Sequence, residues 1–142
     1  MKIATISFPG YMERSIGFTI PNNGRFFVAS WDDLIYCQLD NKQITEVEEH
    51  WKLNSDKKVI CIGDQEIPLI GLWSGAPILN RTGLGELQLH QGLVSLQGNG
   101  EIQQWQFENF SGDWEQVTFD RERKAFLFGA PYDFDYRYVY LD

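Results

Sequence analysis

Basic residues are scarce in this sequence of 142 residues, which has 12 lysines and arginines against 20 aspartates and glutamates and a formal net charge of −8. Proteins that bind nucleic acids need clustered basic side chains to neutralise the phosphates. The one basic cluster, residues 121–124, is short, and we interpret it as a polar turn or the cover of a sheet edge. We therefore expect no nucleic-acid partner, and the acidic balance favours a basic protein partner instead.

Cysteine and histidine are also rare, at two residues each: Cys37, Cys61, His50 and His90. Both cysteines lie in apolar stretches, which is typical of buried, reduced thiols in a cytosolic protein, and a disulfide between them is the less favoured alternative. None of the four residues has the short Cys-x-x-Cys or His-x-x-x-His spacing of a structural zinc site. We therefore predict no metal site.

Long hydrophobic runs are missing as well. The least polar stretch, residues 67–79, is interrupted by prolines and glycines and is shorter than the roughly 20 residues that cross a bilayer. The apolar segment after Met1 ends at Pro9 and is too short for the core of a signal peptide. We expect a cytoplasmic protein with no membrane partner.

The common short motifs of catalysis and cofactor binding do not occur. There is no Gly-x-Ser-x-Gly and no Walker pattern, and residues 83–86 lack the third glycine of a dinucleotide-binding loop. We therefore expect no cofactor and favour a non-catalytic protein. A catalytic site assembled from residues far apart in the sequence stays an open alternative.

Aromatic residues, in contrast, are abundant: 10 Phe, 6 Tyr and 5 Trp make up 15% of the chain, and hydrophobic residues make up 43%. A chain of this length and composition can bury a hydrophobic core without a disulfide or a metal. We expect one domain that spans residues 1–142.

Turn-forming residues recur about every ten positions, and the segments between them are rich in β-branched and aromatic residues. This pattern predicts an all-β fold, an antiparallel meander of short strands that closes as a barrel or a sandwich. The dipeptides Asn23-Gly24 and Asn99-Gly100 suit the positive φ angles of type I′ turns, which join paired antiparallel strands.

Four strand-turn-strand units of similar length are evenly spaced along the chain, at residues 26–39, 59–73, 93–107 and 125–141. A small propeller-like repeat of hairpins is therefore the alternative architecture, because propeller blades are built from such units. The units share no sequence motif beyond the hairpin shape, which favours the simple meander.

Residues 42–52 can be interpreted as the one short helix of the protein or as strand. Ile44, Val47 and Trp51 have the spacing of an apolar helical stripe. Strand is favoured, because residues 40–43 look like the loop of a hairpin that joins this segment to the preceding strand.

The C-terminal segment has an aromatic residue at every second position: Tyr132, Phe134, Tyr136, Tyr138 and Tyr140. In a strand these side chains share one face. The favoured interpretation is that this face packs on the core, with each phenol oxygen hydrogen-bonded to a polar partner. Alternatively, the part near Tyr132 and Tyr136 is exposed as a recognition surface.

The leading functional hypothesis is a binding protein that acts through a protein-protein interface, for example an inhibitor or an immunity-type protein that masks the basic active site of a toxin. The candidate interface combines Tyr132 and Tyr136 as anchors with Asp133 and Asp135 as steering charges. If this strand is purely structural, the candidates move to the tryptophan-bearing turns at Trp31, Trp73 and Trp114.

Two other functions compete with this hypothesis. One is a small-ligand or carbohydrate-binding β module in which Trp31, Trp73, Trp105 or Trp114 forms an aromatic platform. The other is a hydrolase that uses Asp133 and Asp135 as a carboxylate pair. A flat aromatic patch with an acidic rim would favour a protein partner, a concave tryptophan-lined pocket a ligand, and converging carboxylates an enzyme.

Overall fold

The computed structural model describes residues 2–12, 15–71, 78–108, 114–130 and 135–141. These residues form strands and no helix. In chain order, the strands are β1 (Lys2–Ser7), β2 (Gly17–Thr19), β3 (Arg25–Ala29), β4 (Leu34–Gln38), β5 (Gln43–Glu46), β6 (Trp51–Asn54), β7 (Val59–Ile62), β8 (Gln65–Gly71), β9 (Arg81–Thr82), β10 (Gly85–His90), β11 (Leu93–Gly98), β12 (Glu101–Gln106), β13 (Gln116–Phe119), β14 (Ala125–Gly129) and β15 (Asp135–Tyr140).

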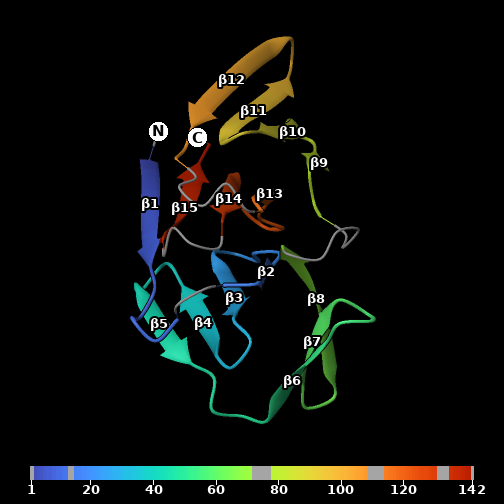
Figure 1. Ribbon diagram of the computed structural model, residues 1–142. Coiled ribbons are helices and arrows are strands. Elements are labelled where there is room, and N and C mark those ends of the chain that lie inside the picture. Colours follow the sequence, from blue (N-terminus) through green and yellow to red (C-terminus); the bar gives the residue numbers. More distant parts are fainter. Residues whose placement is uncertain (1, 13–14, 72–77, 109–113, 131–134, 142) are drawn as a thin grey trace.

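The strands form three antiparallel sheets that follow one another along the molecule (Figure 1). The upper sheet has the order β12-β11-β10-β9, the central sheet β1-β15-β14-β13, and the lower sheet β5-β4-β3-β2-β8-β7-β6. The predicted all-β, antiparallel architecture is confirmed. The N-terminal strand β1 pairs with the C-terminal strand β15, so the two ends of the chain meet in the central sheet.

All four predicted hairpin units are present, as the pairs β3-β4, β7-β8, β11-β12 and β14-β15. They do not form separate propeller blades, because β2 pairs with both β3 and β8 and joins two of the units into the seven-stranded lower sheet. The two predicted type I′ turns are also confirmed by positive φ angles, 56° and 76° at Asn23 and Gly24 and 55° and 75° at Asn99 and Gly100.

The segment 42–52 contains no helix, and it holds two strand segments separated by residues 47–50, which are not strand. Its first part is β5, which pairs with β4 through Cys37 and Ile44, and its end begins β6, which pairs with β7. The strand interpretation holds because β5 completes a hairpin with β4 and buries one side of Ile44 against the core.

In the central sheet, the inner strand β14 is buried at every position, whereas the edge strand β1 is mostly exposed. Ala125 and Leu127 face the lower sheet and pack in a cluster with Phe18 and Phe26. Phe126 and Phe128 face the upper sheet, in a second cluster that includes Val94 and Leu96. This position between two layers explains why the sequence of β14 is a continuous hydrophobic run instead of an alternating one.

A third cluster lies inside the lower sheet, which curls on itself. Ala29 and Leu34, at one end of the sheet, contact the same core as Ile60 and Ile62 at the other end. Because β2 and β8 separate these strands in the sheet order, only a curled sheet brings them together.

The carboxylate of Asp120, which is 3% exposed, links the central and lower sheets. Its Oδ1 accepts hydrogen bonds from the backbone N–H groups of Asn23 (2.9 Å), Glu122 (2.8 Å) and Arg123 (3.1 Å). Its Oδ2 accepts from the N–H of Gly24 (2.8 Å) and from the hydroxyl of Tyr138 (2.7 Å). One side chain thus fixes the turn at residues 22–25, its own turn and strand β15.

These contacts also control the ionisation of both partners. Burial by itself would raise the pKa of Asp120, but the hydrogen bonds from Tyr138, Glu122, Gly24 and Asn23 outweigh it, so the pKa is lowered. The pKa of the Tyr138 hydroxyl is raised, first by burial and then by its hydrogen bond to Asp120. The pair is therefore a neutral phenol that donates to a carboxylate.

The described residues contain no helix that is long and apolar enough to cross a bilayer.

We predict that Asp120→Asn lowers the free energy of unfolding by about 2–4 kcal/mol, because an amide nitrogen then faces N–H donors in a buried site. Since the pKa of Asp120 is lowered in the folded state, its contribution is complete above the pKa of an unfolded aspartate, about 3.9, and is lost as the pH falls below it. Urea unfolding at several pH values between about pH 3 and pH 7, which span the pKa of an unfolded aspartate, measures both effects.

The matched control is Glu66→Gln, at an exposed ion pair with Lys57, which should change the free energy of unfolding by less than about 0.5 kcal/mol. Equal stabilities of wild type and Asp120→Asn at neutral pH would contradict the role of the carboxylate.

The two cysteines should differ in reactivity. Both are free; Cys37 is buried, and burial raises its pKa to about 12. The expectation that Cys61 is buried too is only partly met: Ile60 and Ile62 face the core, so Cys61 between them points outward and is half-buried. A thiol reagent should label Cys61 in the native protein and Cys37 more than about tenfold more slowly until denaturant is added. Equal native rates would contradict this difference.

Candidate functional site

The C-terminal candidate residues do not form a surface that the structure describes. Tyr132 and Asp133 lie outside the described residues, and Asp135 is described only by its backbone, which pairs with Ser7 at the start of β15. The geometry of an Asp133 and Asp135 carboxylate pair therefore lies outside the described part of the chain.

Tyr136 is a core residue with no exposed surface. Its ring makes edge contacts with Phe8 (centroids 4.7 Å apart) and Phe18 (5.3 Å), and its hydroxyl is hydrogen-bonded to the buried Ser15 hydroxyl at 2.8 Å. Burial raises its pKa. An exposed interface anchor at Tyr136 does not fit this burial, whereas the core interpretation, with a polar partner for the phenol, does.

Most tryptophans also contribute to packing. Trp73 lies outside the described residues. Trp114 is half-buried and stacks on Phe18 with ring centroids 6.3 Å apart, and Trp105 packs edge-on against Phe126 at 5.0 Å. Neither offers an exposed platform.

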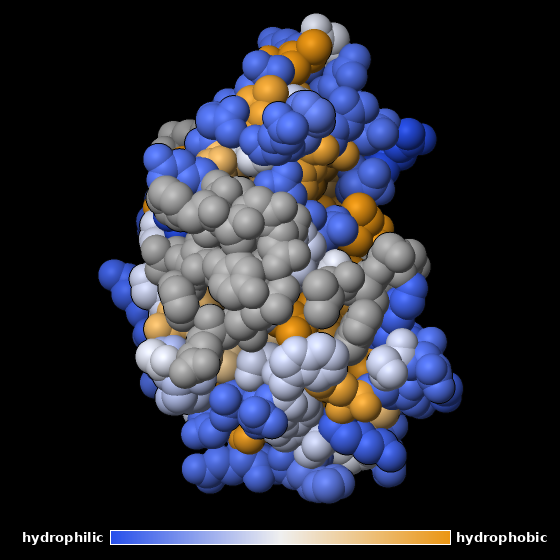
Figure 2. Space-filling view, in the orientation of Figure 1, coloured by the Kyte–Doolittle hydropathy of each residue, from blue (hydrophilic) through white to orange (hydrophobic). Residues whose placement is uncertain are grey.

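Hydrophilic residues cover both ends of the molecule on the face in Figure 2, and hydrophobic residues emerge there only in small groups. Among the described residues, the exposed large hydrophobic side chains are Ile3, Tyr11, Trp31, Ile78 and Ile102. The two aromatic residues among them are Trp31, with 58% of its surface exposed, and Tyr11, with 47%.

Trp31 stands on a tight turn between β3 and β4. Two hydrogen bonds close this turn, from the Ser30 N–H to the Asp33 carbonyl (2.8 Å) and from the Asp33 N–H to the Ser30 hydroxyl (3.0 Å). Ser30 is buried, so the turn holds Trp31 and Asp32 outward on a fixed base.

A groove of about 540 Å³ lies beside this turn and is lined by Trp31, Asp32, Trp51, Lys52, Leu53 and Ser55. Trp51 begins β6 and is half-buried, because one side of it packs on the cluster inside the lower sheet. The groove is therefore lined by an exposed indole, a half-buried indole and an acidic residue.

Acidic residues accompany these aromatic residues: Asp32 lines the groove, and Asp33 follows it in the turn. The pKa of Tyr11 is raised, first by partial burial and then by the negative charges of Glu46 and Asp33. The backbone N–H of Val47 donates to the carbonyl of Leu34, which holds the end of β5 beside the Trp31 turn. We call this region the aromatic-acidic surface and define it by Tyr11, Trp31, Asp32, Asp33, Glu46 and Trp51.

The sequence indicated only part of this surface. Trp31 was a candidate, but Tyr11 and Trp51 were not. Tyr11 directly follows the Pro9-Gly10 turn, and a large aromatic residue beside a turn is a signal that could have suggested exposure. Trp51 carried no such signal, because its place beside Trp31 depends on how the lower sheet curls.

Among the described residues, no three histidines, cysteines, aspartates or glutamates are grouped so that they could hold a metal ion. Comparisons of this chain with protein-family models, with curated proteins and with solved structures found no match. The functional assignment therefore rests on the geometry of the chain itself.

We predict that Tyr136→Ala lowers the free energy of unfolding by about 3–5 kcal/mol, because it empties a buried aromatic site. Tyr136→Phe should cost only about 1 kcal/mol, the net value of the hydrogen bond to Ser15. Denaturant unfolding of both variants measures the difference, with Tyr11→Ala as the exposed control, expected within about 0.5 kcal/mol of wild type. A Tyr136→Ala protein as stable as wild type would contradict the core position.

Proposed function

We propose that this protein binds a basic protein partner through the aromatic-acidic surface. The observation that carries the proposal is Trp31, a large indole that is 58% exposed on a hydrogen-bonded turn and is followed by two aspartates. Tryptophan is enriched among the residues that dominate binding energy at protein interfaces. A rigid turn also reduces the entropy that must be lost when the partner binds.

The groove between Trp31 and Trp51 suits a lysine or arginine side chain of the partner. An indole face attracts a cation through its quadrupole, and Asp32, which also lines the groove, would offer a carboxylate for a charge-assisted hydrogen bond. The net charge of −8 would increase the association rate with a basic protein at low salt. These features support an inhibitor or immunity-type role, in which the surface covers a basic site on the partner.

A second candidate function uses the same groove for a carbohydrate. The observation in its favour is that the surface is concave at this point, with two indoles that could stack on sugar rings and with Asp32 and Ser55 as polar partners. A neutral sugar would bind with little salt dependence, whereas a basic protein would bind more weakly as salt is added.

We predict that Trp31→Ala weakens binding of the partner at least about 30-fold, the effect of losing an interface hot spot. The immobilised protein would capture partners from the native lysate, and each captured protein would be purified and titrated by calorimetry. The double change Asp32→Asn with Asp33→Asn should mainly lower the association rate and reduce its salt dependence.

The matched controls are Ile102→Ala and Glu101→Gln on strand β12, where Ile102 is 63% exposed and distant from the surface in the upper sheet. They should bind like wild type. Partners that bind Trp31→Ala as tightly as wild type would contradict the proposal. Binding of a glycan on an array, lost in Trp31→Ala and insensitive to salt, would establish the second function instead.

A further inference from the structure

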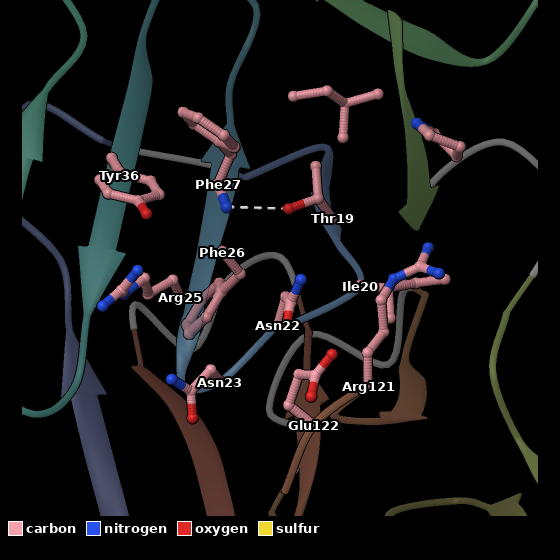
Figure 3. A pocket seen from close by; sticks show the side chains of 12 residues that line it. Thr19, Ile20, Asn22, Asn23, Arg25, Phe26, Phe27, Tyr36, Arg121 and Glu122 are labelled. Carbon is pink, nitrogen blue, oxygen red and sulfur yellow. Dashed lines mark hydrogen bonds between the residues drawn. The ribbon is translucent and has the colours of Figure 1, made fainter. Parts of the chain in front are cut away.

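A second concave site, separate from the aromatic-acidic surface, lies where the lower sheet opens. Strand β2 pairs with β8 only at three positions and ends at Thr19, opposite Leu69. The next residues, Ile20 and Pro21, turn away toward the type I′ turn, and Pro68 of β8 has no N–H with which to continue a ladder. Strand β3 and the first half of β8 are left with a cleft of about 630 Å³ between them (Figure 3).

One part of the cleft is apolar. Phe27 of β3 and Tyr36 of β4 form a cross-strand aromatic pair with ring centroids 4.7 Å apart and planes tilted by 40°. Ile67 and Pro68 line the cleft from β8. This volume and lining are within the range of small-molecule sites, which run from about 300 to 1,000 Å³.

The other part of the cleft is polar and mostly basic. Arg121 and Glu122, from the turn after β13, lie on one side of the view in Figure 3, and Arg25 of β3 lies on the other. The three side chains together carry a net charge of +1 in a chain whose net charge is −8. Arg25 and Arg121 are thus the positive charges that could attract an anion to the cleft.

Arg121 is placed to act on a ligand. Within the described part of the chain its guanidinium makes no ion pair, whereas Arg123 binds Asp40 at 2.6 Å and Arg81 binds Glu86 at 2.7 Å. Its backbone is held, because its N–H donates to the carbonyl of Pro21 at 2.9 Å.

The two turns that carry the polar residues are fixed to each other. The Asp120 carboxylate accepts from Asn23, Gly24 and Glu122, and the Arg123 Nε donates to the Asn23 side chain at 2.8 Å. The cleft is therefore largely preformed, which lowers the entropy cost of binding.

We propose that this cleft binds a small anionic ligand with an aromatic body. The guanidinium of Arg121 pairs with the carboxylate or phosphate of the ligand, and the aromatic body lies against Phe27 and Tyr36. The site shares no residue with the aromatic-acidic surface, so the inference stands whether or not that surface binds a protein.

The experiment is a titration of the ¹⁵N-labelled protein, followed by amide chemical shifts, with 3-phenylpropionate and phenyl phosphate as the two anionic probes. Saturable shifts at Phe27, Arg121 and Glu122 are expected with at least one probe, and the preferred one identifies the anion. The neutral 3-phenylpropionamide and the ring-free propionate should bind at least about tenfold more weakly than 3-phenylpropionate.

Arg121→Gln should weaken binding of the preferred probe about tenfold. Arg81→Gln, an exposed arginine in the upper sheet, is the matched control and should leave it unchanged. Because Arg121 makes no ion pair with a described residue, Arg121→Gln should have the melting temperature of wild type. A loss of binding in this variant can then be distinguished from a loss of folding. No saturable shift up to about 20 mM probe, equal affinity for the amide, or equal affinity of Arg121→Gln would each overturn the proposal.

Discussion

The buried carboxylate of Asp120 is the contact on which the arrangement of this protein depends. It joins a turn in the lower sheet to a turn and a strand of the central sheet. The residues in its hydrogen bond with Asn23 are 97 positions apart in the sequence. A carboxylate that is 3% exposed is stable only if its oxygens are fully hydrogen-bonded, and here N–H groups and the Tyr138 hydroxyl satisfy both. The interaction therefore selects one relative position of the two sheets, because another would leave a buried charge without partners.

The central sheet shows where function can be placed in such a fold. Because clusters of hydrophobic residues cover both faces of its inner strands, aromatic residues there serve packing, as Tyr136 does in one cluster and Phe126 in the other. The two large aromatic residues that are exposed in the described part of the chain, Tyr11 and Trp31, lie in turns. Trp31 and Arg121 both lie in turns. Hydrogen bonds between Ser30 and Asp33 hold the turn of Trp31, and the backbone N–H of Arg121 donates to the carbonyl of Pro21. Both proposed sites therefore use side chains that are carried by turns and not by the buried strands.

Local chemistry was predictable from the sequence, and long-range contact was not. Asn23-Gly24 and Asn99-Gly100 specify their turns by their own backbone preferences, and the alternation around Tyr136 was enough to favour the core. In contrast, nothing near Asp120 in the sequence indicates its donors at Asn23 and Gly24. The cleft was missed for the same reason, since it depends on where β2 ends relative to β8. The groove at Trp31 was missed in part, because Trp51 reaches it only through the curl of the lower sheet.

The most direct test of this account is the ionisation of Asp120 in the native protein. A ¹³C titration of the side-chain carboxyl carbons, with Asp120 assigned by comparison with Asp120→Asn, gives its pKa without unfolding the chain. The five donated hydrogen bonds predict a value below that of an ordinary aspartate, with Asp120 among the last carboxylates to be protonated. A pKa at or above the ordinary value would contradict the account, because it would mean that burial dominates and that the carboxylate does not hold the two sheets together.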